Sequence, residues 1–132
     1  CITFDSALSH RLYAGADLLL MPSQFEPCGL SQMIAMRYGA LPVVREVGGL
    51  KDSVIAYDRF TKTGNGFSFA NYNAHEFLFT LTNAVDIYHN NHDDWNILVT
   101  NAMATDFSWE KSARQYLSLY QSLKPEVYGY FK

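Results

Sequence analysis

Residues Pro22–Gln32, PSQFEPCGLSQ, place an acid, a thiol and a glycine between an apolar segment and a segment with helical spacing. We call residues 22–30 the acid loop. A loop that leads from a strand into a helix presents free backbone N–H groups, which carry partial positive charge and suit an anion such as a diphosphate. Here these groups belong to Cys28, Gly29, Leu30 and Ser31. We expect an anion-binding helix start, with Gly29 allowing close approach of the backbone.

Glu26 is unexpected beside a diphosphate, because two anions repel. A carboxylate is better suited to accept hydrogen bonds from hydroxyl groups, and sugars carry many of them. A sugar diphosphate would use both features, with its phosphates on the helix N–H groups and its hydroxyls on Glu26. A simpler interpretation stands beside this one, since an acid favours any helix N-terminus and Gly29 suits an ordinary turn.

A second glycine-bearing turn follows the next apolar segment. Gly48 and Gly49 precede Leu50 at the start of a short expected helix, and we call residues 46–49 the glycine turn. Arg45 ends the apolar segment and could supply a fixed cation. Two helix starts with glycines could flank one ligand if they lie on the same edge of a sheet.

The surrounding pattern alternates helices with short apolar strands. We expect helices at about 5–15, 30–38, 50–56, 73–89, 95–104 and 108–123, strands at about 17–23, 40–46 and 66–70, and a loop at 58–65. This alternation is typical of an α/β, Rossmann-like parallel sheet flanked by helices, whose ligands bind at the carboxyl ends of the strands. Three strands are few for such a sheet, so its first half is expected to precede Cys1 and to leave an unpaired strand edge.

Composition narrows the class of protein. The chain has 132 residues, 48% of them hydrophobic, and a formal net charge of −3, which argues against broad contact with nucleic acid or anionic membranes. No apolar run reaches the ~20 residues of a membrane span, and no signal peptide is evident. The two cysteines favour a reducing compartment. His89 and His92 have possible metal-ligand spacing, but without a third ligand we expect a surface position and no metal site.

Four blocks, in order, carry a family resemblance. HRLYAGADLLLMPSQFEPCGLSQMIAMRYG and ALPVVREVGGLKDSV, followed by GNGFSFANYNAHEF and AMATDFSWEKSARQYLSLY, resemble the bacterial glycogen synthase and plant starch synthase family over residues 10–123. The resemblance implies the later part of the C-terminal domain of a two-domain GT-B glycosyltransferase. Residues 1–132 would then be one partial domain with a tail at 124–132, and the N-terminal domain would be a partner outside this chain.

The activity that the resemblance implies is retaining transfer of glucose from ADP-glucose to the nonreducing end of an α-1,4-glucan, without a cofactor or metal. Glu26 looks like the family's acid at the donor glucose. The donor-contacting positions look like Phe4, Cys28, Gly29, Leu30, Ser31, Gly48, Gly49 and Leu50. Phe4 falls where the family commonly has a tyrosine stacked on adenine, although packing within its helix explains this ring equally well.

One departure weakens the expected preference for the donor, because Val47 replaces the threonine common in the glycine turn and one hydroxyl is missing. Ile34 stands where related glycosyltransferases often have a second glutamate, but this position is non-acidic in the resembled family too. A GT-B transferase that uses UDP-glucose and a non-catalytic glucan-binding module therefore stay open as alternatives. The chain is expected to be inactive alone, and its location would be cytoplasmic in a bacterium or plastidic in a plant.

Three further side chains have expected positions. Trp95 and Trp109 are expected in the core, because large aromatic side chains contribute most when buried. Asp94 is expected at a solvated helix start beside Asp93.

Overall fold

The sheet consists of three parallel strands in the order β1-β2-β3. They are β1 Leu18–Met21, β2 Leu41–Arg45 and β3 Phe67–Phe69. Met21 pairs with Val44, and Arg45 pairs with Phe69, so all three strands end at the same edge. We call this edge, with the loops that follow it, the carboxyl edge. The expected α/β architecture is confirmed.

Six helices accompany the strands in the computed structural model, which describes residue 2 and residues 5–124. Their bounds are α1 Ser6–Gly15, α2 Ser31–Tyr38, α3 Gly48–Ser53, α4 Ala74–Asn90, α5 His92–Ala104 and α6 Trp109–Leu123. Phe4, with its expected adenine contact, and tail residues 125–132 lie outside the described residues.

Local signals start and end these helices as the sequence predicts. Asp5 accepts a hydrogen bond from the backbone N–H of Leu8 at 3.0 Å and caps α1. Asn73 and Ser108 cap α4 and α6 in the same way. Gly39 ends α2 in the left-handed conformation, with φ at 85°, which a residue without a Cβ adopts at little cost.

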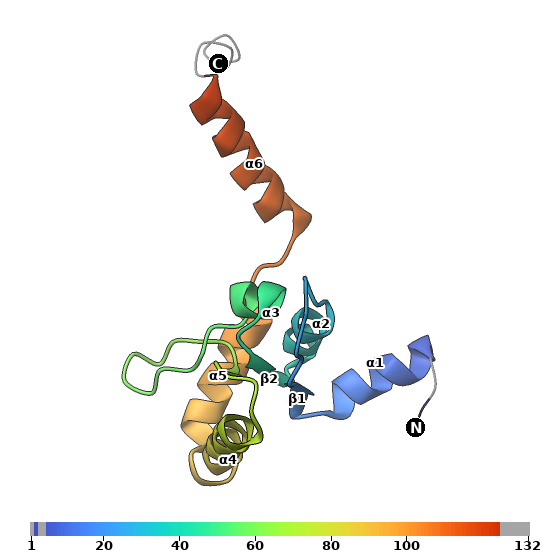
Figure 1. Cartoon of the computed structure of the whole chain (residues 1–132), viewed down its shortest axis with the longest axis vertical. Coiled ribbons are helices and arrows are strands. Elements are labelled where there is room, and N and C mark those ends of the chain that lie inside the picture. The colour runs from blue at the N-terminus through green and yellow to red at the C-terminus, as the bar shows by residue number, and fades with distance from the viewer. Residues whose placement is uncertain (1, 3–4, 125–132) are drawn as a thin grey trace.

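The core lies around β2, whose first four residues are buried. Helices α2, α3, α4 and α5 all contact this central strand. One buried cluster joins side chains of α2, α3, β3 and α5, among them Met36, Leu50, Phe67 and Leu98. Helix α6 projects away from this body in Figure 1, whereas α1 contacts α2, and neither helix buries a residue.

Several details differ from expectation. Helix α3 begins at Gly48 instead of Leu50 and ends at Ser53. Helix α5 begins at His92 instead of Trp95, because the single residue Asn91 both ends α4 and caps α5. Within residues 58–65, Asp58 and Thr63 form an antiparallel bridge, so this loop is ordered as a tight turn.

The two tryptophans have opposite environments. Trp95 is buried and packs edge-on against Tyr88, with ring centroids 4.9 Å apart, as expected for a core residue. Trp109 is 89% exposed, and within the described part of the chain α6 buries none of its residues. The expectation of a core position for Trp109 is therefore wrong for this chain.

Asp94 also differs from its expected solvated position. It is buried, and its carboxylate accepts a hydrogen bond from the Lys62 ammonium at 2.6 Å. Lys62 reaches it from the turn at 58–65 with a φ of 57°, in the left-handed region. The hydrogen bond from Lys62 holds the pKa of Asp94 below its usual range. The same bond raises the pKa of Lys62.

In the described part of the chain, no helix is long and apolar enough to cross a membrane. No group of three or more His, Cys, Asp or Glu side chains there is arranged to hold a metal ion.

Candidate functional site

Three loops meet at the carboxyl edge. The acid loop follows β1, the glycine turn follows β2, and residues 70–73 follow β3. Tyr72 brings the third loop into contact with the end of β2, because the Arg45 guanidinium lies over its ring at 5.5 Å from the centroid. A pocket of about 320 Å³ opens between Pro22, Phe69 and Phe77 at the same edge. The sequence prediction that both glycine-bearing turns share one edge is confirmed.

The acid loop and the glycine turn interlock through their backbones. The N–H of Gly49 donates to the carbonyl oxygen of Pro27 at 3.3 Å. A Cβ added to Gly48 would lie 2.0 Å from the carbonyl oxygen of Glu26, and one added to Gly49 would lie 2.0 Å from that of Cys28. Both glycines are therefore required by the neighbouring loop, whatever ligand this edge binds.

Gly29 is required for a different reason. Its φ is 71°, and a Cβ there would lie 2.6 Å from Oε1 of Gln32. The Gln32 side chain is fully buried, and its Nε2 donates to the carbonyl oxygen of Gly29 at 2.9 Å. The sequence prediction treated Gln32 as an ordinary helix residue and missed this contact.

The two helix starts differ in the backbone donors they leave free. Within the described residues, no hydrogen bond outside the regular elements uses the N–H groups at the start of α2, those of Cys28, Gly29, Leu30 and Ser31. At the start of α3, Gly49 donates to Pro27 and Leu50 donates to Val47. An anion would therefore find more free backbone N–H groups at the start of α2, whereas α3 contributes mainly to the shape of the edge.

Glu26 is half-buried, and no hydrogen bond to its carboxylate occurs among the described residues. Glu46, on the glycine turn, differs because its Oε1 accepts from the Ser68 hydroxyl at 2.8 Å. The sequence prediction missed Glu46 as an acid at this edge. Of these two carboxylates, Glu26 is the one that accepts no hydrogen bond among the described residues, so all its acceptor positions are open to hydroxyl groups of a ligand.

Arg45 is already engaged. Its Nη1 donates to the carbonyl oxygen of Gln24 at 2.8 Å and lies 3.5 Å from that of Ser23. Its Nε is buried and has no partner among the described atoms. The guanidinium thus joins the end of β2 to the first part of the acid loop, and stacking on Tyr72 fixes its plane.

The remaining expected residues occupy varied positions. Leu50 is fully buried in the core, so its side chain supports α3 from within. Leu30 and Cys28 are exposed on the acid loop, and Ser31 is half-buried at the first position of α2. The exposed residues of the acid loop also include Phe25, which is 80% exposed.

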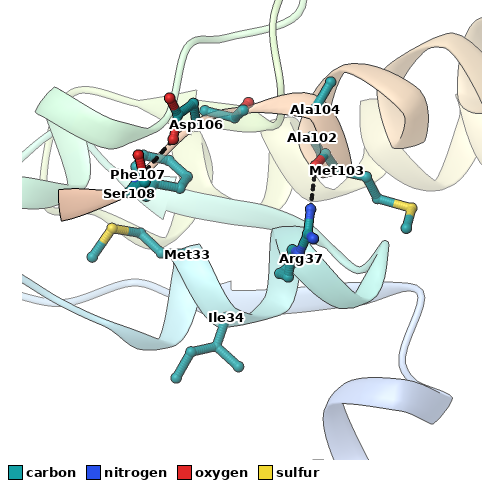
Figure 2. A pocket seen from close by; sticks show the side chains of 10 residues that line it. Met33, Ile34, Arg37, Ala102, Met103, Ala104, Asp106, Phe107 and Ser108 are labelled. Carbon is teal, nitrogen blue, oxygen red and sulfur yellow. Dashed lines mark hydrogen bonds between the residues drawn. The ribbon is translucent and has the colours of Figure 1, made fainter. Parts of the chain in front are cut away.

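Another pocket, of about 520 Å³, lies away from these residues, between α2 and the connection from α5 to α6. Figure 2 shows Met33, Ile34 and Arg37 of α2 on one side and the segment around Met103 and Phe107 on the other. Arg37 donates to the carbonyl oxygen of Met103 at 3.3 Å across this pocket. None of the site residues expected from the sequence lines it.

Comparison with known proteins gives one family and a consistent set of relatives. The family model described as "Glycosyl transferases group 1" matches residues 4–96. The glycogen synthase of Finegoldia magna is 57% identical over 122 residues, and that of Clostridioides difficile is 55% identical over the same length. Each match covers 92% of this chain, and the chain spans about a quarter of the length of these curated relatives.

Two solved structures resemble the chain. The catalytic domain of starch synthase IV from Arabidopsis thaliana, described as bound to ADP and acarbose, matches with a TM-score of 0.81 and 46% identity over 91% of this chain and 25% of its own. Sucrose-phosphate synthase from Thermosynechococcus elongatus matches with a TM-score of 0.63 and 24% identity, over 92% of this chain and 29% of its own. The second likeness shows the fold alone.

Proposed function

Because the chain belongs to the family described as glycosyl transferases group 1, we propose that it forms the nucleotide-sugar-binding part of a glucosyltransferase that extends an α-1,4-glucan. The glycogen synthases and the starch synthase among its relatives support this function. The parallel sheet flanked by helices matches a GT-B glycosyltransferase domain. Since the chain spans about a quarter of these relatives, the rest of a longer enzyme would supply the second wall of the cleft and the glucan site.

The observation that carries the proposal is the pairing of Glu26 with the start of α2. The N–H groups from Cys28 to Ser31 are free to meet a diphosphate, and the Glu26 carboxylate is free to accept from sugar hydroxyls. A sugar diphosphate presents both kinds of group at adjacent positions. A free phosphate would use only the helix start, and a neutral glucan would use only the acid.

The proposed donor is ADP-glucose. Support comes from the Arabidopsis starch synthase domain, which is described as bound to ADP and acarbose. Phe4 would stack on the adenine, although it lies outside the described residues. Val47 leaves the glycine turn without a hydroxyl, and Ser31, the first residue of α2, carries a hydroxyl that could replace that donor.

In the proposed reaction, ADP leaves the anomeric carbon as the glucose gains positive character. Fixed N–H groups at α2 would stabilise the charge that develops on the diphosphate. Glu26 would recognise sugar hydroxyls and stabilise the positive charge on the ring. Retention would follow from attack by the acceptor on the face that the diphosphate leaves. A covalent role for Glu26 is disfavoured, because phosphate is already a good leaving group that needs no acid, and the acid loop itself offers no second carboxylate.

The 132-residue chain offers a direct test of donor binding. We would titrate ¹⁵N-labelled chain with ADP, UDP, ADP-glucose and maltose and follow the backbone amide signals by NMR. The expected result is movement of the Gly29, Leu30 and Ser31 signals with ADP, and a smaller response to UDP. An equal or larger response to UDP would favour the UDP-glucose alternative. A response to maltose without any response to nucleotides would favour a glucan-binding module.

Transfer itself requires the longer enzyme, since the chain alone is expected to be inactive. Glu26→Gln in that enzyme keeps the shape of the side chain and removes its charge. We expect glucose transfer to fall about 100-fold or more, with nearly unchanged affinity for ADP. A Glu26→Gln enzyme that transfers glucose at a near-normal rate would contradict the role proposed for this acid.

A further inference from the structure

We propose that Gln32 and Ser53 are positioning residues, which hold the acid loop and the glycine turn in one fixed arrangement. The inference rests on the proposed function, because the acid loop and the glycine turn together would form the surface that binds the sugar donor. Neither residue reaches the carboxyl edge itself, since Gln32 is fully buried and Ser53 is the last residue of α3. They act through the backbone of the residues that do.

Gln32 holds the end of the acid loop. Its Nε2 donates to the carbonyl oxygen of Gly29 at 2.9 Å and contacts that of Cys28 at 3.3 Å. Both are acceptors only, which fixes the orientation of the side-chain amide. The missing side chain of Gly29 leaves the space that Oε1 of Gln32 occupies. The orientation of the free N–H groups at the α2 start therefore depends on one buried side chain.

Ser53 extends this link to the second turn. Its Oγ accepts from Nε2 of Gln32 at 3.0 Å and donates to the carbonyl oxygen of Gly49 at 2.6 Å. A continuous chain of hydrogen bonds thus runs from Gly29 through Gln32 and Ser53 to Gly49. Such a chain is sensitive to the loss of any member, because the remaining polar groups are buried or half-buried and would lose their partner.

The direct contact between the two loops is too long to replace this chain. Gly49 donates to Pro27 at 3.3 Å, beyond the usual distance for a backbone hydrogen bond. Because Gly48 and Gly49 have no side chains, the acid loop can approach them closely, but this absence supplies no attraction between the two loops. The link through Gln32 and Ser53 supplies the attraction. Glu26, which lies just before Pro27, would lose its fixed relation to the glycine turn without it.

Four single variants, and the double variant Gln32→Met with Ser53→Ala, test the inference in the longer enzyme. Gln32→Met keeps a similar volume without hydrogen bonds, and Ser53→Ala removes the hydroxyl. Ser53→Thr keeps a hydroxyl and serves as the conservative rescue. Leu98→Ala, in the core on α5, is the matched control, because it destabilises the fold without touching either loop.

We expect Gln32→Met and Ser53→Ala each to lower the transfer rate at saturating donor about tenfold or more, because small displacements of positioned groups have large effects on rate. The double variant should be little worse than either single variant, since both break the same link. Ser53→Thr should stay near the parent rate. Leu98→Ala should lower the melting temperature and leave the rate at saturating donor unchanged.

The 132-residue chain supplies a readout that is independent of transfer. In ligand-free ¹⁵N spectra, Gln32→Met should move the amide signals of Gly48 and Gly49, whereas Leu98→Ala should not. Unmoved signals, or moved signals with an unchanged transfer rate, would overturn the inference. If the parent neither binds ADP nor transfers glucose, the proposed function fails, and the Gly48 and Gly49 signals still decide whether the two loops are coupled. Should Gln32→Met not fold, Ser53→Ala gives the same comparison.

Discussion

The backbone N–H of Gly49 points at the carbonyl oxygen of Pro27, 3.3 Å away, so the turn after β2 lies directly against the loop after β1. Parallel strands bring their carboxyl ends together, but this contact needs more than adjacency. It needs two residues without side chains, because a Cβ on either Gly48 or Gly49 would overlap a backbone carbonyl oxygen of the acid loop. The predictions below follow from this arrangement and from the packing that supports it.

Gly49→Ala should destabilise the chain strongly. The added Cβ would lie 2.0 Å from the carbonyl oxygen of Cys28, and backbone atoms move less easily than side chains. We expect the free energy of unfolding to fall by about 3 kcal/mol, measured by urea denaturation. Gly15→Ala is the matched control, since a Cβ at Gly15 meets no atom within 4 Å. Equal stability of the two variants would contradict the close approach of the loops.

Arg45→Lys should show whether Arg45 acts by positioning the acid loop with its planar guanidinium or only through its positive charge. Lysine keeps the positive charge but cannot stack on Tyr72 in the same way or hold the Gln24 carbonyl oxygen with a fixed planar group. If Arg45 fixes the acid loop, we expect ADP to bind about tenfold more weakly to Arg45→Lys, measured by calorimetry. Hydrogen exchange should also become faster at the backbone amides of residues 23–26. Unchanged affinity would assign Arg45 to charge alone.

The Lys62–Asp94 pair predicts a pH dependence of stability. The pKa of Asp94 is lowered in the folded chain, chiefly by its hydrogen bond from Lys62, so the pair stabilises the fold fully above the carboxyl pKa of an unfolded chain, about 4. The contribution is lost as the pH falls through the lower pKa of the folded state. Asp94→Asn should therefore lower the melting temperature at pH 7, and the difference from the parent should shrink under acid conditions.

On the alkaline side of the pH profile, stability is lost as the pH rises, and this loss depends on Lys62. The pKa of Lys62 is raised in the folded chain, so its contribution is complete below about 10.4 and is lost as the pH rises through the higher folded value. The effect should be modest, because Lys62 is partly exposed and water screens the pair. Thermal melts of the parent and Asp94→Asn across the pH range check both limbs. A difference that stays constant down to pH 2 would show that Asp94 acts through packing.

The two tryptophans should respond differently to the same substitution. Trp95→Ala removes a buried ring from the core and should lower the free energy of unfolding by about 3–5 kcal/mol. Trp109→Ala in the same chain should change it by about 0.5 kcal/mol or less, because this ring is exposed on α6. Urea denaturation of both variants makes the comparison. A large loss with Trp109→Ala would mean that α6 packs on the body in solution.

The sequence by itself determined the elements and their order, because the signals for them are local. Asp5, Asn73 and Ser108 cap the N-termini of helices, and Gly39 ends α2. Each of these residues acts on backbone groups only a few residues away in the sequence. The short apolar segments with helices between them also required parallel pairing. That pairing placed the acid loop and the glycine turn at one edge before any contact was known.

Only the tertiary structure decided which groups at that edge remain free. Arg45 is taken by the carbonyl oxygens of the acid loop, and Glu46 is engaged by Ser68, while Glu26 keeps its acceptor capacity among the described residues. Gln32 reads from the sequence as one polar residue of a helix. Its partner Ser53 comes from another segment, and nothing local to either residue predicts their contact.

Asp94 shows most clearly why such contacts could not be predicted from the sequence. An acid in the first turn of a helix is usually solvated, since it gains from the helix dipole without leaving water. Here Lys62 reaches it from a turn far away in the chain, and a charge can be buried when such a partner is present. Capping and periodicity depend on neighbours in the sequence, whereas burial and pairing depend on neighbours in space, which the fold alone brings together.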